Sequence, residues 1–259
     1  MAGMNPQIRV SKNLETLSVA AAEIFTAAAS QSIAERGRFL AALNGGGTPQ
    51  RLFQLLASDF SARVDWTRVH VFWGDERMVP SDDPESSYGL ARTLLLDRVA
   101  IPKDNVHRVH SELDAGAAVA DYSRVLKRFA SPPLDWPRFD LVLLGMGEDG
   151  HTASLFPNSP VDASAPVLAT TGRYQGRPAQ RVTLTPIVFN AARQVVFMVS
   201  GAGKAEMLKR VFDNRYSMEE IPAKRIQPID GQVIWLADEA AGADLALTPN
   251  PSSDERGEQ

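Results

Sequence analysis

FDLVLLGMGEDGHTASLFP, residues 139–157, joins an apolar run to a glycine-rich stretch that carries a histidine. The run FDLVLL is apolar on successive residues, which is typical of a parallel strand covered by helices on both faces. Similar runs recur along the chain and alternate with helix-like stretches, and this alternation predicts an α/β fold. The expected strands are 38–43, 68–74, 139–145, 193–201 and 232–237, and the expected helices are 17–30, 48–57, 84–96, 114–130 and 203–213.

This pattern predicts an open, mostly parallel, twisted sheet with helices on both faces, in the Rossmann-like manner. The sequence shows no internal repeat and no Ser/Gly linker that would divide it, so residues 1–245 are expected to form a single domain. Small insertions are expected around SPPLDWP (131–137) and TTGRYQGRPAQ (170–180). Residues 246–259 have almost nothing to bury, which predicts a disordered tail.

Composition excludes several classes of protein. The 259 residues carry a formal net charge of -4, which gives no basic surface for nucleic acid. The chain has no cysteine, so it has neither disulfides nor thiolate metal sites. Glu15 and Glu23 interrupt the alanine-rich stretch near the start, which predicts an amphipathic surface helix rather than a signal peptide. Because no segment has the ~18 consecutive apolar residues of a membrane span, we expect a cytoplasmic protein.

The glycines of the opening stretch fit the dinucleotide pattern G-x-G-x-x-G, but two observations oppose a nucleotide site. Glu148 and Asp149 would face the doubly charged pyrophosphate. Pro157 comes too soon for the long helix that the pattern requires. We therefore interpret this stretch as a loop that presents His151 at the end of a central strand.

The stretch NGGGTPQRLF, residues 44–53, is a candidate anion site. Gly45, Gly46 and Gly47 let the backbone approach a ligand, and Thr48 followed by proline is typical of a helix start. The free N–H groups of a helix amino terminus bind anions. The stretch lacks the lysine of a nucleoside-triphosphate loop, so it favours a single phosphate. A strand-to-helix turn without a ligand is the alternative.

Charged residues follow the expected strand 68–74 in the motif WGDERMVP, residues 73–80. Charges directly after a buried strand are costly unless they are paired or functional. Arg77 could bind a phosphate or carboxylate in bidentate fashion, and Asp75 could orient a base or a sugar hydroxyl. The alternative is a structural ion pair at the strand end.

His151 is one of 4 histidines, and it follows the strand expected to be central. An imidazole suits proton transfer near neutral pH, although a lone histidine is more often an ordinary hydrogen-bonded residue. His70 lies within an expected strand and is interpreted as core. His107 and His110 lack a third ligand at zinc spacing, so no metal site is predicted. Lys204 begins an expected helix after a strand and could supply a cation to an anionic ligand.

Together these motifs resemble those of the 6-phosphogluconolactonases, which belong to a larger family with glucosamine-6-phosphate deaminase. The resemblance runs from about residue 8 to residue 237, and GDER together with GEDGHTASLFP carries most of its specificity. The deaminases would carry an N-E-P type ending after their Gly-His, where this chain has TASLFP. The motifs occur in family order as NGGGTP, WGDERMVP, ESSYG, LLGMGEDGHTASLFP, RVTLTPIVFNAA, SGAGKAEML and IPAKRIQP.

The resemblance implies hydrolysis of 6-phospho-D-glucono-1,5-lactone to 6-phosphogluconate, with no metal or organic cofactor. His151 would be the base that activates water, and Asp75 would orient His151 or a sugar hydroxyl; the competing assignment makes Asp75 the base. Loop N–H groups near Gly147 or Gly150 would stabilise the oxyanion. The residues implied for phosphate binding are Gly45, Gly46, Gly47, Thr48, Arg77, Lys204 and Arg225.

Two departures from the family pattern affect these roles. The glycine loop usually reads S-G-G-S-T-P, and here Asn44 and Gly47 replace two hydroxyl residues. The family's E-S-N-Y appears with Ser87 in place of the asparagine. Two other functions remain as alternatives: a sugar-phosphate isomerase or deaminase of the same fold, and a sensor without catalysis. The expected partner is the small-molecule lactone, with no nucleic acid or membrane, and the expected assembly is a monomer or weak homodimer.

Overall fold

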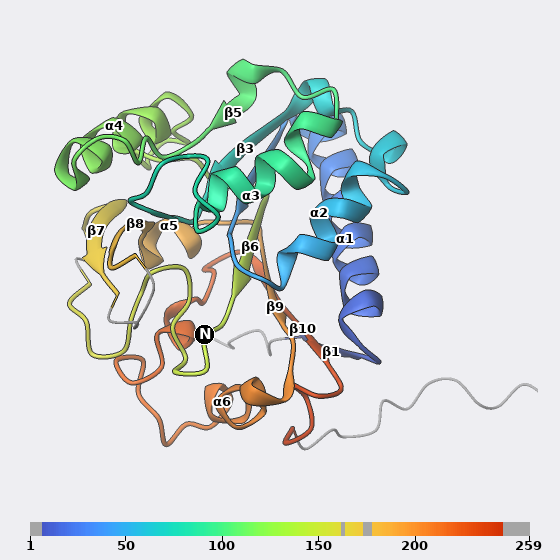
Figure 1. The fold of residues 1–259 in the computed structure, drawn as a ribbon, viewed down its shortest axis with the longest axis vertical. Coiled ribbons are helices and arrows are strands. Elements are labelled where there is room, and N and C mark those ends of the chain that lie inside the picture. Colours follow the sequence, from blue (N-terminus) through green and yellow to red (C-terminus); the bar gives the residue numbers. More distant parts are fainter. Residues whose placement is uncertain (1–6, 162–163, 173–177, 246–259) are drawn as a thin grey trace, which may run out of the picture.

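The computed structural model describes residues 7–161, 164–172 and 178–245. Its central element is a parallel sheet with the strand order β1-β10-β9-β6-β2-β3-β5 (Figure 1). The strands are β1 Gln7–Ser11, β2 Phe39–Leu43, β3 Val69–Trp73, β5 Val106–His107, β6 Leu141–Gly145, β9 Gln194–Val199 and β10 Gln232–Asp238. The predicted parallel sheet is therefore confirmed, with all five expected strands in it.

The sequence did not predict a second, antiparallel sheet of order β4-β8-β7. Its strands are β4 Asp75–Arg77, β8 Gln180–Leu184 and β7 Val167–Thr171. The charged motif after β3 is thus itself a strand, paired with β8, and not simply a loop at a strand end. The expected insertion at 170–180 contains the ends of this hairpin, and its residues 173–177 lie outside the described part of the chain, as does the expected tail 246–259.

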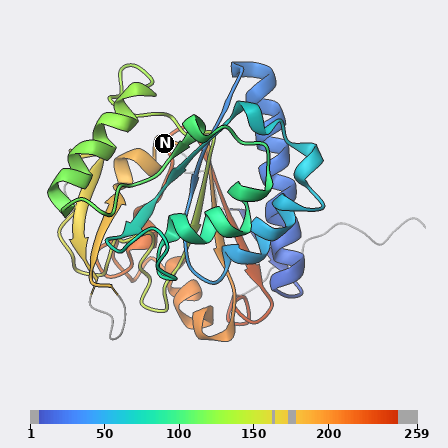
Figure 2. The same cartoon turned by 45° about the horizontal axis from the view of Figure 1, so that its top comes forward.

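Helices cover both faces of the main sheet, as Figure 2 shows. Alternate residues of β2 explain why: Phe39, Ala41 and Leu43 enter one apolar cluster, whereas Leu40 and Ala42 enter the other. The first cluster contains α1 Leu14–Arg36, α2 Pro49–Ala57 and α3 Ser87–Leu94. The second contains α4 Ala115–Arg128, α5 Pro186–Phe189, α6 Ala205–Val211 and the small sheet.

The helix α1 is the one described helix that is long and apolar enough to cross a membrane by length and composition. In the fold it lies against the sheet, and its buried side chains recur at helical spacing, among them Leu17, Ala21 and Phe25. A capping box at Asn13 begins the helix, and Gly37 ends it in the left-handed conformation at φ 74°. One face of the helix is buried and the other is exposed, so the predicted amphipathic surface helix is confirmed.

The strand order places a topological switch point between β2 and β6. From β2 the chain continues outward through β3 and β5, and from β6 it continues the other way through β9 and β10. Ligands of open α/β sheets bind at such a point, outside the carboxyl ends of the strands. The glycine loop 44–48 and the histidine loop 145–151 follow these two strands, so the fold brings together two of the motifs selected from the sequence.

Candidate active site

The loop after β6 presents His151 at the carboxyl edge of the sheet. Nδ1 of His151 lies 2.5 Å from Oδ1 of Asp149, and the same oxygen accepts the backbone N–H of His151 at 3.2 Å. The imidazole is partly buried, with 24% of the side chain exposed. An imidazole that donates through Nδ1 keeps Nε2 for proton transfer. The sequence predicts Asp75 as the helper of His151 and overlooks Asp149.

Two glycines shape this loop. A Cβ on Gly147 would lie 2.0 Å from Nδ1 of His151, so only glycine leaves room for the ring. Gly150 has φ 82°, and a Cβ there would lie 2.9 Å from Cγ2 of Ile221. The N–H of Gly147 donates to the carbonyl of His151 at 2.8 Å, and the N–H of Gly150 to the carbonyl of Gly147 at 3.1 Å. Both N–H groups donate to carbonyl groups within the loop. Their proposed hydrogen bonds to an oxyanion stay a prediction.

Asp75 reaches the histidine loop through Ser154. Its carboxylate is buried and accepts a hydrogen bond from Oγ of Ser154 at 2.6 Å. The backbone N–H of Ser154 donates to Oγ1 of Thr183 at 3.3 Å, and Thr183 pairs with Asp75 across β4 and β8. Since Ser154 follows His151 by three residues, this network fixes the loop to the small sheet. The role of Asp75 in catalysis stays a prediction.

Glu76 holds the amino terminus of α3. Its carboxylate is 1% exposed and accepts the backbone N–H groups of Arg77, Ser87 and Tyr88, each at 2.7 Å, and Oγ of Ser86 at 3.2 Å. Burial raises the pKa of Glu76, although these N–H groups favour the charged form. A carboxylate at a helix amino terminus is also stabilised by the helix dipole. Glu76 therefore has a structural role: it binds the backbone at the start of α3.

Replacing Glu76 with alanine is expected to lower the free energy of unfolding by about 3–5 kcal/mol, because buried N–H groups lose their acceptor. Glu76→Gln keeps an acceptor oxygen and the side-chain volume, so it should lose less. Urea denaturation of both variants measures the difference. A loss below about 1 kcal/mol in Glu76→Ala would contradict the role given to this carboxylate.

Arg77 is directed toward the segment before α3. Its Nη1 donates to the carbonyl of Glu85 at 2.5 Å and lies 3.5 Å from the Glu85 carboxylate. The side chain is 12% exposed, and its Nε has no hydrogen-bond partner among the described residues. Phosphate binding by Arg77 stays a prediction, and it would compete with the contacts to Glu85.

The glycine loop packs against the start of α3. A Cβ on Gly45 would lie 2.4 Å from Oγ of Ser87, and Gly46 has φ 99°, a backbone conformation that favours glycine. Thr48 occupies the N-cap position of α2 before Pro49, as predicted, but its side chain makes no capping hydrogen bond. Its hydroxyl and the first N–H groups of α2 are thus the anion-binding elements that the loop offers.

Asn44 and Ser87, two of the three residues that depart from the family pattern, both adjoin this glycine loop: Asn44 precedes Gly45 in the chain, and Ser87 packs against Gly45. Oδ1 of Asn44 and Oγ of Ser87 are buried and have no hydrogen-bond partner among the described residues. A Cβ on Gly74 would lie 2.2 Å from Oδ1 of Asn44, so the asparagine packs directly on the backbone between β3 and β4. Both side chains therefore set the shape of the loop by close packing.

Two further segments contact the histidine loop. Lys204 is the N-cap residue of α6, and a Cβ on the preceding Gly203 would lie 2.7 Å from Oε1 of Glu148. The backbone N–H of Ala223 donates to the carbonyl of Gly150 at 3.1 Å, which docks the 3₁₀ helix η6 Pro222–Arg225. The guanidinium of Arg225 donates to the carbonyl of Met218 at 3.0 Å. The predicted phosphate contacts of Lys204 and Arg225 are not tested by this arrangement and stay predictions.

Arg181, a cation near the histidine loop, has no predicted role from the sequence. This side chain is 4% exposed, and its Cζ lies 5.8 Å from the ring centroid of Phe156. The Phe156 ring is in turn 5.3 Å from the ring of His151. In the sequence, an arginine between residues of mixed polarity looks like an ordinary solvent-facing residue. The pairing of β8 with β4 is what buries it.

The remaining histidines pair with one another or with a carboxylate outside the histidine loop. His70 and His107 form a stacked pair, with Nδ1 of His70 3.1 Å from Nε2 of His107. His110 pairs with Asp121 at 2.8 Å. In the described ranges, no three side chains of the metal-binding types gather into a group. Burial lowers the pKa of His70, and burial, the neighbouring His70 and Arg128 lower the pKa of His107 to about 4.

The His70–His107 pair is expected to make the protein less stable in mild acid. The unfolded chain takes up a proton near pH 6.5, whereas the folded pair resists it, so stability falls as the pH drops from about 6.5 toward about 4. For a half-exposed group we expect a loss of roughly 1–2 kcal/mol. Urea denaturation at pH 7.5 and pH 4.5 should show a smaller difference for His107→Phe than for the wild type. Equal differences would contradict this assignment.

Comparisons with known proteins find relatives that match most of the chain. The sequence matches the family model described as "Glucosamine-6-phosphate isomerases/6-phosphogluconolactonase" over residues 12–235. A 6-phosphogluconolactonase of Synechocystis is 41% identical over 244 residues, which cover 93% of this chain and 99% of that protein. A solved structure of 6-phosphogluconolactonase from Trypanosoma brucei has a TM-score of 0.83 and 28% identity, and the match covers 93% of this chain and 99% of that one.

The fold is also that of a deaminase. A solved structure of a monomeric glucosamine-6-phosphate deaminase has a TM-score of 0.77 and covers 92% of this chain and 99% of its own. At 19% identity this likeness concerns the fold alone. The predicted resemblance to the deaminase fold is confirmed.

Proposed function

The chain belongs to the family of glucosamine-6-phosphate isomerases and 6-phosphogluconolactonases, and from this premise we propose that it hydrolyses 6-phospho-D-glucono-1,5-lactone to 6-phosphogluconate. The observation that carries the proposal is the pairing of His151 with Asp149 at the switch point of the sheet, beside a glycine loop at a helix amino terminus. A base and an anion-binding loop at one edge are what a phosphorylated lactone requires.

In the proposed reaction, Nε2 of His151 takes a proton from water as the water attacks C1 of the lactone. The carboxylate of Asp149 holds Nδ1 and stabilises the imidazolium that forms. As the tetrahedral intermediate collapses, the same imidazolium returns a proton to the ring oxygen, so the C1–O bond breaks and the open acid leaves. Asp149 thereby acts as a positioning residue for His151.

We place the phosphate at the Gly45–Thr48 loop, with Arg77 and Lys204 as its cations and Arg225 as a further partner. Each charge-assisted hydrogen bond is worth about 1.5–3 kcal/mol, so the loss of one should mainly raise KM. Asp75 either meets a sugar hydroxyl or acts on the histidine loop through Ser154. A cytoplasmic location and a monomer or weak homodimer complete the proposal.

Substrate comparison tests this function. The protein should accelerate hydrolysis of the phosphorylated lactone, prefer it strongly to unphosphorylated glucono-1,5-lactone, and release no ammonia from glucosamine 6-phosphate. Ammonia or a ketose phosphate as product would favour the isomerase or deaminase alternative. Saturable binding of sugar phosphates without turnover would favour the sensor.

A further inference from the structure

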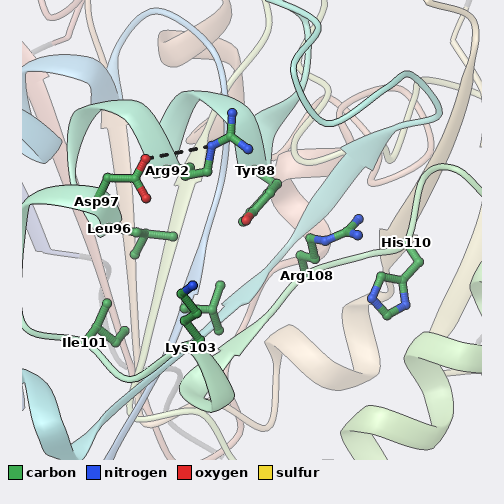
Figure 3. Close-up of a pocket in the computed structure, with 9 residues that line it drawn as sticks. Tyr88, Arg92, Leu96, Asp97, Ile101, Lys103, Arg108 and His110 are labelled. Atoms are coloured by element: carbon green, nitrogen blue, oxygen red, sulfur yellow. Dashed lines mark ion pairs between the residues drawn. The ribbon is translucent and has the colours of Figure 1, made fainter.

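A pocket lies between α3 and the segment that contains β5. Its volume is about 800 Å³, within the range of small-molecule sites. Figure 3 shows its side chains around a common opening, with Arg92 and Asp97 on one side and Lys103 opposite. The apolar part of the lining consists of Leu96, Ile101, Val106 and the ring of Tyr88.

Cations from separate segments meet in this pocket. Arg92 comes from α3, Lys103 from the 3₁₀ helix η4 Lys103–Asn105, and Arg108 follows β5. Both guanidinium groups lie near the Tyr88 ring, with Cζ of Arg92 5.7 Å and Cζ of Arg108 5.3 Å from its centroid. On a chain of net charge -4, a pocket with three permanent cations and one lining carboxylate, that of Asp97, is a local reversal of charge.

The ion pairs of the pocket leave part of this charge uncompensated. Arg108 is bound by the carboxylate of Glu112 at 2.6 and 2.8 Å, and His110 by Asp121 at 2.8 Å. Nε of Arg92 approaches the Asp97 carboxylate only to 4.0 Å. Lys103 has no ion-pair partner in the described part of the chain, and its ammonium is exposed at the pocket wall. Arg92 and Lys103 are thus the groups available to an anion.

We propose that this pocket binds an organic phosphate with a flat apolar ring, for which a nucleotide is the matching chemical class. The ring lies against Leu96, Ile101 and Val106, and the phosphate contacts Arg92 and Lys103. The lining suits both parts of such a ligand. Apolar side chains pack against a heterocycle, whereas guanidinium and ammonium groups bind a phosphate. The proposal of this site does not rest on the proposed lactone hydrolysis.

The pocket is connected to the catalytic edge through the start of α3. The backbone N–H of Tyr88 donates to Glu76, the residue after Asp75, and the Tyr88 ring lies 5.4 Å from that of Trp73 at the end of β3. The neighbouring Ser87 packs on Gly45 of the glycine loop. A ligand bound against Tyr88 therefore contacts the start of α3, which packs on Glu76 and on the glycine loop, and we expect it to change KM.

Isothermal titration calorimetry with ADP tests the proposal. ADP is expected to bind the full-length wild type with a Kd below about 1 mM, and Arg92→Ala and Lys103→Ala are each expected to weaken binding about tenfold or more. Arg98→Ala is the matched control, since it removes one charge from the same region but its guanidinium donates to the Thr93 carbonyl outside the pocket. It should bind ADP like the wild type.

Adenosine and pyrophosphate separate the two parts of the ligand. Weaker binding of each alone than of ADP would support a pocket that uses both ring and phosphate. The proposal is overturned if ADP gives no saturable binding, if Arg98→Ala loses as much affinity as Arg92→Ala, or if pyrophosphate or adenosine alone binds as tightly as ADP.

Discussion

Replacing His151 with alanine is expected to lower kcat for lactone hydrolysis about 10²- to 10⁴-fold, with a smaller change in KM. The expected loss is that of a general base, roughly 3–5 kcal/mol of activation free energy. The side chain is partly exposed at the surface of the loop, so its removal should leave the fold intact. Steady-state kinetics together with urea denaturation measure both effects.

Two carboxylate variants distinguish the base from its helpers. If His151 is the base, Asp149→Asn should lower kcat less than His151→Ala, because the imidazole remains and loses only the negative charge beside Nδ1 that stabilises the imidazolium. Asp75→Asn should also lose less, since Asp75 contacts the loop through Ser154. If Asp75→Asn instead loses far more kcat than His151→Ala, then Asp75 is the base and the role given to His151 is wrong.

Gly147→Ala is expected to lower kcat about 10²-fold in a protein that still folds. The new Cβ would lie 2.0 Å from Nδ1 and 2.2 Å from Cε1 of His151, so the imidazole must move. A displacement of about 1 Å of a catalytic group can cost this much. The loop backbone does not require glycine here for its φ angle, since Gly147 is not among the glycines with positive φ.

Gly145→Ala is the matched control in the same segment. A Cβ at Gly145 would have nothing within 4 Å, and its φ is not positive. This variant should keep kcat within about twofold of the wild type, because it changes backbone entropy but no contact of the loop. Equal losses in both variants would show that the loop is sensitive to any side chain, and would contradict the specific clash with His151.

The hydrophobic pattern predicted the parallel sheet because its inner strands are apolar on successive residues, as in β6 and β9. β1 and β5 escaped prediction for the opposite reason: β1 alternates in polarity at an edge, and β5 has only 2 residues. The small sheet was also missed, because β4 is formed by the charged residues Asp75–Arg77 and is stabilised by pairing with β8 more than a hundred residues later. Such long-range pairing cannot be predicted from the local hydrophobic pattern.

The same distinction applies to the site. Glycine-rich loops at strand ends are visible in sequence, and the parallel sheet brings the ends of β2 and β6 together. Side-chain partnerships are not visible in this way. The hydrogen bond of Asp149 to His151, the burial of Arg181 and the direction of Arg77 toward Glu85 depend on rotamers and on distant segments. Sequence therefore predicted the edge of the sheet where the candidate residues gather, and the structure supplied the contacts within it.

The most direct test is the rate at which the purified protein opens freshly prepared 6-phospho-D-glucono-1,5-lactone, followed by acid release and compared with spontaneous hydrolysis in the same buffer. We predict a saturable rate far above the spontaneous one for the wild type and a rate close to background for His151→Ala. A wild-type rate equal to spontaneous hydrolysis would contradict the assignment of lactonase activity to this site.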